Sequence, residues 1–302
     1  MKNSNQTTNK NLTVLAVGAA GHFAGLVVPE LAKRGARIRG LIQDPKQRDA
    51  VIKNGAAEVI VGDLTDRASI DAALKGVDAV FYIAPAFIAG EAEIGKGMVE
   101  AAKRARVRRF VFSSVINPVI SALENHIEKA PVEEAIIESG MEFVLLEPTL
   151  FFQNIAGAWA KVVETGTYGE PWSDETRFSR VDYRDVAEAA AIALTEDRLL
   201  YGTYQLCSEG IFNRKEVANL MSEVLGKKIK AVTVTPPAPK PADKSGNAGQ
   251  PSPTQRMFDW YNLRGLVGNA LVLRAILGRE PRSLRAYFEE LAAQAQAARS
   301  GK

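Results

Sequence analysis

The chain has 302 residues, of which 46% are hydrophobic and 24% charged, which is typical of a soluble globular protein and excludes a disordered or fibrous one. Its 38 lysines and arginines nearly balance 35 aspartates and glutamates, so we do not expect a nucleic-acid partner. A single cysteine, Cys207, excludes an intrachain disulfide, and with only two histidines we expect no metal site. The longest apolar stretch, residues 14–28, is shorter than a membrane-spanning helix. We expect a cytoplasmic protein that does not enter a membrane.

Residues 1–11 are polar and lack periodicity, which predicts a disordered leader. Short apolar runs then alternate with helical segments, the first of them His22 to Arg34. The apolar runs predict six strands, at Thr13 to Val17, Ala36 to Ile42, Glu58 to Val61, Ala79 to Ile83, Arg109 to Phe112 and Glu142 to Leu146. Such alternation forms right-handed βαβ units around a parallel sheet. Residues 12–150 are therefore predicted to be a doubly wound α/β domain of the Rossmann type.

Residues 151–299 are predicted to form a smaller α/β cap that supplies a substrate pocket, and some of its segments could return to the first sheet. The predicted elements are helices at Tyr183 to Thr195, Arg214 to Leu225, Met257 to Leu277 and Ser283 to Arg299, and strands at Thr203 to Leu206 and Ala231 to Val234. Residues 235–255 contain six of the 14 prolines among polar residues, which predicts a flexible surface loop.

The sequence VGAAGHFAG, from Val17 to Gly25, lies between the first predicted strand and the first predicted helix. Gly18 permits a tight turn, Gly21 lets the backbone approach a pyrophosphate, and Ala24 permits close packing of helix on strand. The N–H groups and dipole of the helix start favour phosphate binding. The alternative is a turn that binds nothing. The residues predicted to bind a dinucleotide here are Gly18, Ala20, Gly21, His22 and Phe23.

The end of the second strand bears on the choice between NAD and NADP. Gln43 can hydrogen-bond either form of the ribose. Asp44 would suit NAD, but an Asp followed by Pro more often caps a helix, and we favour that interpretation. The nearby cations favour NADP without deciding the question; they are Arg39, Lys46 and Arg48.

The ends of the third and fourth strands supply further cofactor candidates. Asp63, followed by Leu64, could accept a hydrogen bond from the adenine amino group, or could cap the helix predicted near Arg67. The predicted packing contacts of the nicotinamide ribose are Ile83, Ala84 and Pro85.

Seven segments, in this order, resemble the NmrA-like group of atypical short-chain dehydrogenases from Leu12 to about Leu291: VLAVGAAGHFAG, LIQDPKQ, VIVGDLTD, FVFSSV, FVLLEPTLFFQN, VDYRDVAEAAAIAL and ILGREPRSLRAYF. The resemblance implies an NAD(P)-binding Rossmann domain with a small cap. It also implies one of two functions, an NAD(P)H-dependent reductase, such as a quinone reductase, or a redox sensor without turnover. Two residues depart from the pattern. Gln43 stands where arginine is common, and Asn125 stands where the superfamily's proton-donating tyrosine precedes a lysine, here Lys129.

Lys129 is the first candidate for catalysis, because a lysine near the ribose can orient the cofactor and lower the pKa of a neighbouring donor. The alternative is a solvated pair with Glu133 at helical i,i+4 spacing. Because Pro131 disfavours the interior of a helix, the helix could begin there, with Lys129 on a loop.

Three further polar candidates follow from position and chemistry. Ser113 and Ser114 end the fifth strand, and Ser113 is the preferred contact, although such a pair often only caps or turns. His126 could donate a proton, although an isolated histidine more often has no role. Asp182 and Asp185 are expected to cap the helix from Tyr183 or to lie in its first turn.

Phe151, Phe152 and Asn154 follow the sixth strand at its carboxyl end, where open α/β sheets bind ligands, and predict contacts to a flat apolar substrate. For Phe151 plain core packing is the favoured alternative.

The function expected from these observations is an NAD(P)H-dependent oxidoreductase that reduces a small apolar electrophile, such as a quinone, by direct hydride transfer. The predicted catalytic residues are Lys129, Ser113 and His126. The alternative, supported by Asn125, is a redox regulator that binds NAD(P) without turnover and acts through a protein partner.

Overall fold

The computed structural model describes residues 12–85, 88–234 and 252–300, which form two compact units. The sheet unit comprises the described residues of Met1–Val119, Glu128–Glu147 and Tyr183–Tyr204. The cap unit comprises those of Ile120–Ile127, Pro148–Asp182 and Gln205–Lys302. One later segment, Tyr183–Tyr204, thus belongs to the sheet unit, a return that the sequence analysis allowed for, and one short early segment, Ile120–Ile127, belongs to the cap unit.

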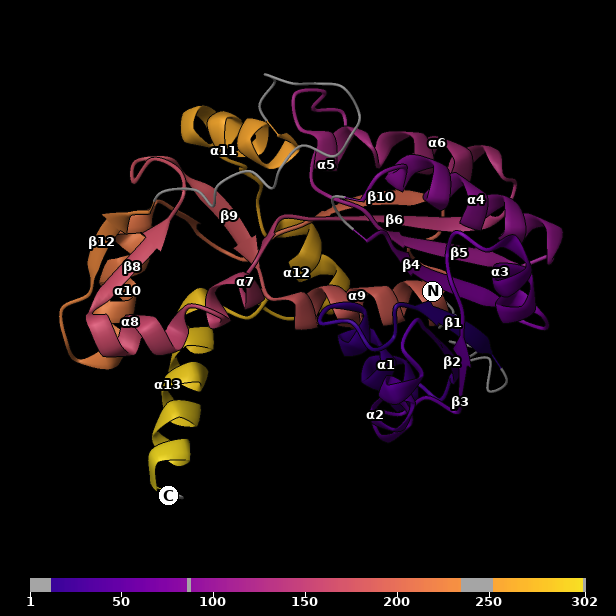
Figure 1. The fold of residues 1–302 in the computed structure, drawn as a ribbon, viewed down its shortest axis with the longest axis horizontal. Coiled ribbons are helices and arrows are strands. Elements are labelled where there is room, and N and C mark those ends of the chain that lie inside the picture. The colour runs from indigo at the N-terminus through magenta and orange to yellow at the C-terminus, as the bar shows by residue number, and fades with distance from the viewer. Residues whose placement is uncertain (1–11, 86–87, 235–251, 301–302) are drawn as a thin grey trace, which may run out of the picture. The chain divides into compact units, whose positions relative to one another are not determined.

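Seven strands form the main sheet, in the order β10-β6-β5-β4-β1-β2-β3 (Figure 1). Their bounds are β1 (Thr13–Val17), β2 (Arg37–Ile42), β3 (Glu58–Val61), β4 (Ala79–Ile83), β5 (Arg109–Ser113), β6 (Glu142–Pro148) and β10 (Gly202–Leu206). The neighbouring pairs from β6 to β3 are parallel. This order confirms the predicted doubly wound sheet, and all six predicted strands are present within two residues of their expected ends.

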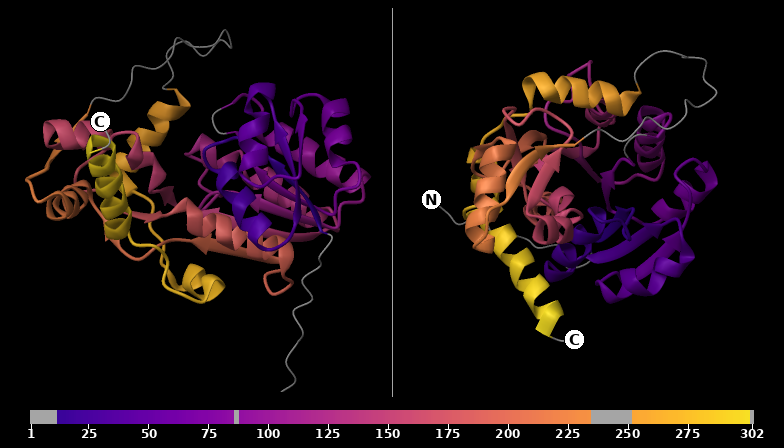
Figure 2. Two further views of the ribbon diagram at one scale, coloured as in Figure 1. Left: turned by 90° about the horizontal axis from the view of Figure 1, so that it is seen from below. Right: turned by 60° about the vertical axis from the view of Figure 1, so that its left-hand side comes forward.

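Helices cover both faces of this sheet (Figures 1 and 2). They are α1 (Ala24–Lys33), η1 (Pro45–Gln47), α2 (Arg48–Lys53), α3 (Arg67–Leu74), α4 (Glu91–Arg104), α6 (Ala130–Glu138) and α9 (Tyr183–Thr195). One face packs on α3, α4 and α6 around the aromatic rings of Tyr82, Phe110 and Phe112. The other face packs on α1 and α9. Because both faces are covered, the central strands are almost continuously apolar.

Arg109 is a charged residue at the start of the buried strand β5 and is only 1% exposed. Its Nη1 donates to the carbonyl oxygens of Ala193 and Glu196, at 3.0 and 2.7 Å, at the end of α9. Its Nη2 pairs with the carboxylates of Glu142, at 2.8 Å, and Asp197, at 2.5 Å. The guanidinium therefore satisfies the last carbonyls of α9 and joins this helix to two strands.

The cap unit contains two small sheets, with strand orders β11-β9-β7 and β12-β8. Its strands are β7 (Leu150–Phe151), β8 (Thr167–Glu170), β9 (Phe178–Val181), β11 (Ile211–Phe212) and β12 (Lys230–Thr233). Its helices are α5 (Glu124–Ile127), α7 (Gln153–Ala156), α8 (Trp159–Thr165), α10 (Arg214–Leu225), α11 (Pro253–Arg264), α12 (Leu271–Leu277) and α13 (Leu284–Ser300). The prediction of a helix over Arg214 to Leu225 is confirmed, and Asn213 and Glu216 begin it with a capping box.

Two predictions about the cap unit need correction. The single helix predicted from Met257 to Leu277 is wrong, because the chain forms α11 and α12 with Gly265 at φ 65° between them. A Cβ on Gly265 would lie 2.0 Å from the Arg177 carbonyl oxygen, so the chain bends where only glycine fits. The predicted leader, residues 1–11, lies outside the described residues. So does most of the flexible loop predicted over 235–255, but the end of that loop is described and is helical. Pro253 starts α11, and Ser252 caps it by accepting a hydrogen bond from the Gln255 N–H.

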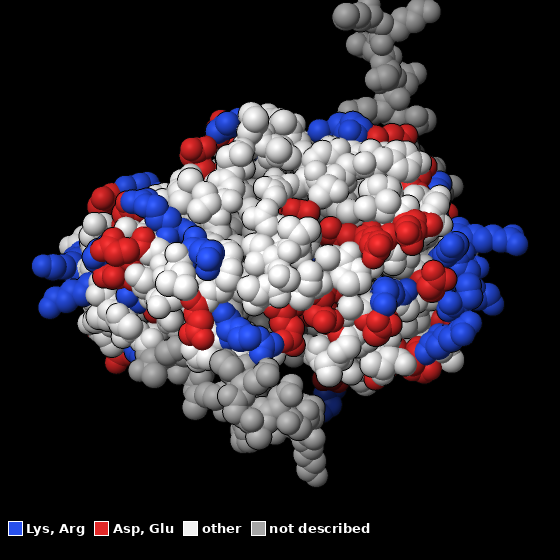
Figure 3. Space-filling model, turned by 90° about the horizontal axis from the view of Figure 1, so that it is seen from above, with Lys and Arg blue, Asp and Glu red and all other residues white. Residues whose placement is uncertain are grey.

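On the face of the molecule that Figure 3 shows, Lys and Arg are interspersed with Asp and Glu. Among the described residues, no helix is both long and apolar enough to cross a membrane.

Candidate cofactor and active site

The glycine-rich loop between β1 and α1 has the backbone geometry that its sequence predicts. Gly18 has a φ of 69°, and the Gly21 N–H donates to the Gly18 carbonyl oxygen at 2.7 Å, which closes the turn. Gly18, Gly21 and His22 are exposed, so a ligand can reach the loop backbone. A Cβ on Gly21 would lie only 3.0 Å from the Gly18 carbonyl oxygen, in the turn itself. The loop is therefore a cradle that a side chain would fill, as pyrophosphate binding requires.

The start of α1 is open to an anion. Phe23 is its N-cap, and no side chain caps this end of the helix. A helix N-terminus without a capping side chain presents N–H donors and a partial positive charge. The Phe23 ring packs against the Tyr183 ring of α9, with ring centroids 4.9 Å apart. The predicted nucleotide residues of this loop thus lie together and fit a phosphate group.

The polar residues in and after β2 are of two kinds: some make hydrogen bonds within the protein, and others are exposed. The Asp44 carboxylate accepts a hydrogen bond from the Lys46 N–H at 2.9 Å and caps η1, which confirms the capping interpretation. Arg39 donates to Glu58 at 3.0 Å and to the Ala73 carbonyl oxygen at 2.9 Å, so its guanidinium is held beside β3 and the end of α3. Gln43 and Lys46 are exposed at this strand end.

Asp63 stands at the end of β3 in a small turn of its own. Its carboxylate accepts hydrogen bonds from the N–H and the hydroxyl of Thr65, both at 2.8 Å, and these bonds lower the pKa of Asp63. The alternative that Asp63 caps α3 is wrong, because Asp66 caps that helix through the Ala68 N–H at 3.0 Å. Leu64 packs on the core of the sheet unit, and Ala84, after β4, is buried.

Ser113 and Ser114 project in opposite directions at the end of β5 because side chains alternate along a strand. The Ser113 hydroxyl is fully buried, 3.0 Å from the Tyr183 hydroxyl of α9. Burial raises the pKa of Tyr183. Tyr183 thus controls the orientation of the Ser113 hydroxyl, a role that the local sequence around Tyr183 did not indicate.

Lys129 is the N-cap of α6 and is buried, with Pro131 in the first turn of the helix. The predicted start of a helix at Pro131 is thus one residue late. The Lys129 Nζ lies 2.5 Å from Oε1 of Glu91, a buried residue in the first turn of α4. The alternative prediction, a solvated pair between Lys129 and Glu133, is therefore wrong, because the ammonium is buried and paired with Glu91. Sequence reasoning missed Glu91, because no local pattern joins residues 38 positions apart.

Two more carboxylic acids lie near Lys129. Burial raises the pKa of Glu133, on α6, to about 7, and the nearby charge of Glu147 adds to this rise. The Ser114 hydroxyl and the Lys129 ammonium oppose it. Glu147 itself is buried near the end of β6. The sheet unit therefore holds one buried lysine among three acids at the carboxyl ends of its strands.

The remaining predicted residues belong to the cap unit. His126 is fully buried in α5, and Asn154 is exposed in α7. Phe152 is 1% exposed and packs on Tyr287, with ring centroids 5.6 Å apart, so core packing describes Phe152 better than the half-buried Phe151. Asp185, by contrast, belongs to the sheet unit, and it lies in the first turn of α9, as predicted.

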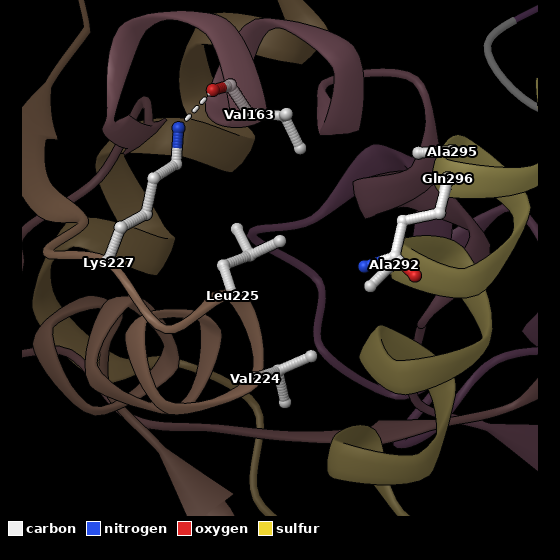
Figure 4. A pocket seen from close by; sticks show the side chains of 7 residues that line it. All are labelled: Val163, Val224, Leu225, Lys227, Ala292, Ala295 and Gln296. Carbon is white, nitrogen blue, oxygen red and sulfur yellow. Dashed lines mark hydrogen bonds between the residues drawn. The ribbon is translucent and has the colours of Figure 1, made fainter. Parts of the chain in front are cut away.

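A pocket of about 240 Å³ lies in the cap unit, on elements that carry none of the predicted site residues (Figure 4). Its lining is Val163, Val224, Leu225, Lys227, Ala292, Ala295 and Gln296. The Lys227 ammonium donates to the Val163 carbonyl oxygen. Lys227 is the one ionisable side chain of this lining, and its ammonium is used in that hydrogen bond. Among the described residues, no group of three or more His, Cys, Asp or Glu side chains is placed to hold a metal ion.

Comparison with known proteins identifies the family. Residues 10–248 match the NmrA-like family. The chain belongs to that family, as its seven segments predicted. An NAD(P)H azoreductase of Xenophilus azovorans is 27% identical over 226 residues, which are 74% of this chain and 77% of that protein. Quinone oxidoreductase 2 of Escherichia coli is 22% identical, over 72% of this chain and 76% of its own.

Solved structures agree on the fold. The NmrA-like chain matches the triphenylmethane reductase of a Citrobacter species, complexed with NADP(H), with a TM-score of 0.78, 21% identity and coverage of 92% of this chain and 99% of that one. It matches the NADPH-dependent quinone oxidoreductase of Escherichia coli, complexed with NADPH, with a TM-score of 0.76, 20% identity and coverage of 93% and 99%. These matches confirm the α/β fold.

Proposed function

We propose that this protein is an NAD(P)H-dependent reductase that transfers hydride directly to a small apolar electrophile such as a quinone. The observation that carries the proposal is the open glycine loop, in which the Gly18 turn leads to the start of α1, where no side chain caps the helix. The names of two relatives, an NAD(P)H azoreductase and a quinone oxidoreductase, support the same chemistry. The cytoplasmic location stays a prediction.

The proposed position of the cofactor in the sheet unit follows from the predicted binding residues. The pyrophosphate would lie on the loop from Gly18 to Phe23, and Asp63 would face the adenine. We propose a preference for NADP over NAD, because the Asp44 carboxylate is used as a helix cap while Lys46 is exposed beside Gln43. When bound, the reduced nicotinamide supplies the hydride.

The protein itself would contribute charge and orientation. Reduction of a carbonyl or quinone places negative charge on an oxygen, and a nearby ammonium stabilises that charge. Lys129 would supply this ammonium, with Glu91 holding it in place. The contributions of Ser113, His126, Phe151, Phe152 and Asn154 to catalysis or substrate binding stay predictions.

The test begins with calorimetric titration of the protein with NADPH, NADH, NADP⁺ and NAD⁺ at one salt concentration. We expect NADPH to bind most tightly and to be oxidised in the presence of 1,4-benzoquinone. Lys129→Met should leave the NADPH affinity within about threefold and lower turnover by about 100-fold. Lys103→Met, an exposed site on α4, is the control. Unchanged turnover in the Lys129 variant would rule out the role assigned to this lysine.

The same titration separates the reductase from a redox sensor. A sensor would bind an oxidised form preferentially and oxidise NADPH with none of the acceptors offered. That outcome would replace the reductase proposal with the search for a protein partner.

A further inference from the structure

Helix α1, which follows the glycine loop, is attached to α9 at both of its ends. At the start, the Phe23 ring packs against the Tyr183 ring, with ring centroids 4.9 Å apart and the planes tilted by 46°. Just after the end, the Arg34 guanidinium lies 2.6 Å from the Glu196 carboxylate. Because one contact joins the starts of the two helices and the other joins their ends, α1 and α9 run side by side in the same direction. The position of α9 therefore fixes the direction in which α1 presents its N-terminus.

The start of α1 is held by ring contacts rather than by a capping side chain. Phe23 is the N-cap residue, and no side chain makes a capping hydrogen bond there. Its ring lies edge-on to His22, with centroids 5.0 Å apart, and against Tyr183 on α9. A capping hydroxyl or carboxylate would compete with a phosphate group for the N–H donors of the helix start. A ring contact orders the helix start without occupying any of these donors.

Tyr183 is itself fixed at both ends of its side chain. The residue is fully buried, and its hydroxyl lies 3.0 Å from the Ser113 hydroxyl, which is also fully buried. Ser113 ends β5 and is paired in register with Ile83 of β4 and Leu146 of β6, so it belongs to the middle of the main sheet. A tyrosine side chain has only two main torsions, and contacts at the ring and at the hydroxyl together determine its orientation.

These contacts form a continuous path from the middle of the sheet to the glycine loop. Ser113 holds the Tyr183 hydroxyl, and the Tyr183 ring holds the Phe23 ring. The sheet unit contains all three residues. A binding loop that the protein already orders costs a ligand less entropy on binding than a loop that the ligand must order itself.

We propose that Tyr183 is a positioning residue for the cofactor pyrophosphate: through Phe23 it fixes the start of α1, and Ser113 anchors it. This inference rests on the proposed function, because the pyrophosphate is the ligand that the glycine loop is proposed to bind. Tyr183 acts through Phe23 and forms or breaks no bond in the reaction.

The first experiment measures the coupling of the two rings by calorimetric titration with NADPH. The variants are Phe23→Leu, Tyr183→Leu and the two combined, each at a temperature where it is folded. An aromatic pair contributes about 2- to 10-fold to an affinity, so each single change should weaken NADPH binding by about 5- to 10-fold. The combined variant should lose little more than either single variant, because each ring acts through the other. Independent roles would instead multiply the two losses.

The matched control breaks the other attachment of α1 to α9. Arg34→Met removes the pair with Glu196 at the end of the helix that lies away from the glycine loop. It should leave the NADPH affinity within about twofold of the wild type, and its effect should multiply with that of Phe23→Leu. A loss as large as that of Tyr183→Leu would show that any loosening of α1 on α9 weakens binding, and would overturn the specific role of Tyr183.

A conservative variant separates the ring of Tyr183 from its hydroxyl. Tyr183→Phe keeps the ring against Phe23 and removes the hydrogen bond to Ser113, and it should keep the NADPH affinity within about threefold of the wild type. If Tyr183→Leu does not fold, the decision falls to Phe23→Leu, since Phe23 is only half-buried. An unchanged NADPH affinity in Phe23→Leu would overturn the inference.

The outcomes separate the inference from the proposed function. A wild type that binds none of NADPH, NADH, NADP⁺ and NAD⁺ would overturn the proposed function and with it the role of Tyr183. A wild type that binds NADPH, with losses in the Phe23 and Tyr183 variants that multiply, would overturn the role of Tyr183 and leave the reductase in place.

Discussion

The Lys129 ammonium lies 2.5 Å from the Glu91 carboxylate, and the two side chains are only 8% and 2% exposed. This pair joins the start of α6 to the first turn of α4 at the carboxyl edge of the sheet. A buried charge needs its partner, because removal of one member leaves the other without compensation. Glu91 is therefore a positioning residue for Lys129.

Replacement of Glu91 tests this relationship. Glu91→Gln keeps the volume of the side chain but removes its charge, and we expect the free energy of unfolding to fall by about 3 kcal/mol. Glu93→Gln on the same helix removes an exposed pair with Lys96 and should cost about 1 kcal/mol or less. Urea unfolding at pH 7 measures both. Equal losses of unfolding free energy would show that the buried pair contributes no more to stability than the exposed pair.

Two glycines of α4 should respond in opposite ways to alanine. A Cβ on Gly95 would lie 2.5 Å from a methyl group of Val132 on α6, whereas a Cβ on Gly97 meets nothing within 4 Å. Gly95→Ala should push α6 from α4 and destabilise the fold by about 1–3 kcal/mol. Gly97→Ala should stabilise it by about 0.5–1 kcal/mol, because alanine loses less entropy in a helix. Thermal unfolding of both variants gives the comparison, and a stabilised Gly95→Ala would contradict close packing of the two helices.

The glycine loop can be tested with a matched pair of positive-φ glycines. Gly18 has a φ of 69°, and Gly35, just after α1, has a φ of 77°. A Cβ added at either position would meet no atom closer than 3.9 Å. Each change to alanine should cost about 1–3 kcal/mol of stability through backbone strain. Only Gly18→Ala should also weaken NADPH binding, by about tenfold or more, because it distorts the phosphate turn. Calorimetric titration at a temperature where both variants are folded decides this, and equal NADPH affinities would place the nucleotide elsewhere.

Cys207 provides a test of packing in the cap unit. Burial raises the pKa of its thiol to about 12, so at pH 8 only about one molecule in 10⁴ carries a thiolate. We expect an aromatic disulfide reagent to leave the native protein unmodified at pH 8 and to react fully in 8 M urea. Because the chain has one cysteine, the absorbance of the released thiol reports this site alone. Rapid stoichiometric reaction without urea would show that Cys207 is accessible.

The sequence by itself determined the elements that depend on neighbouring residues. The strands from β1 to β6 follow from apolar runs, the turn at Gly18 from a glycine spacing, and the cap at Asp44 from an Asp-Pro pair. Each of these depends on backbone preferences and on hydrogen bonds within a few residues, so a local pattern contains the necessary information.

The tertiary structure alone decided which side chains meet. It paired Lys129 with Glu91 rather than with Glu133, placed Tyr183 against Ser113, and returned α9 and most of β10 to the sheet unit. Helical spacing predicted the wrong partner for Lys129 because α4 packs on α6 closely enough, at Gly95, for a buried carboxylate to reach the ammonium. Partners 38 and 70 residues apart are selected by the packing of helices on the sheet and by the need to compensate buried charge, and no local pattern encodes either.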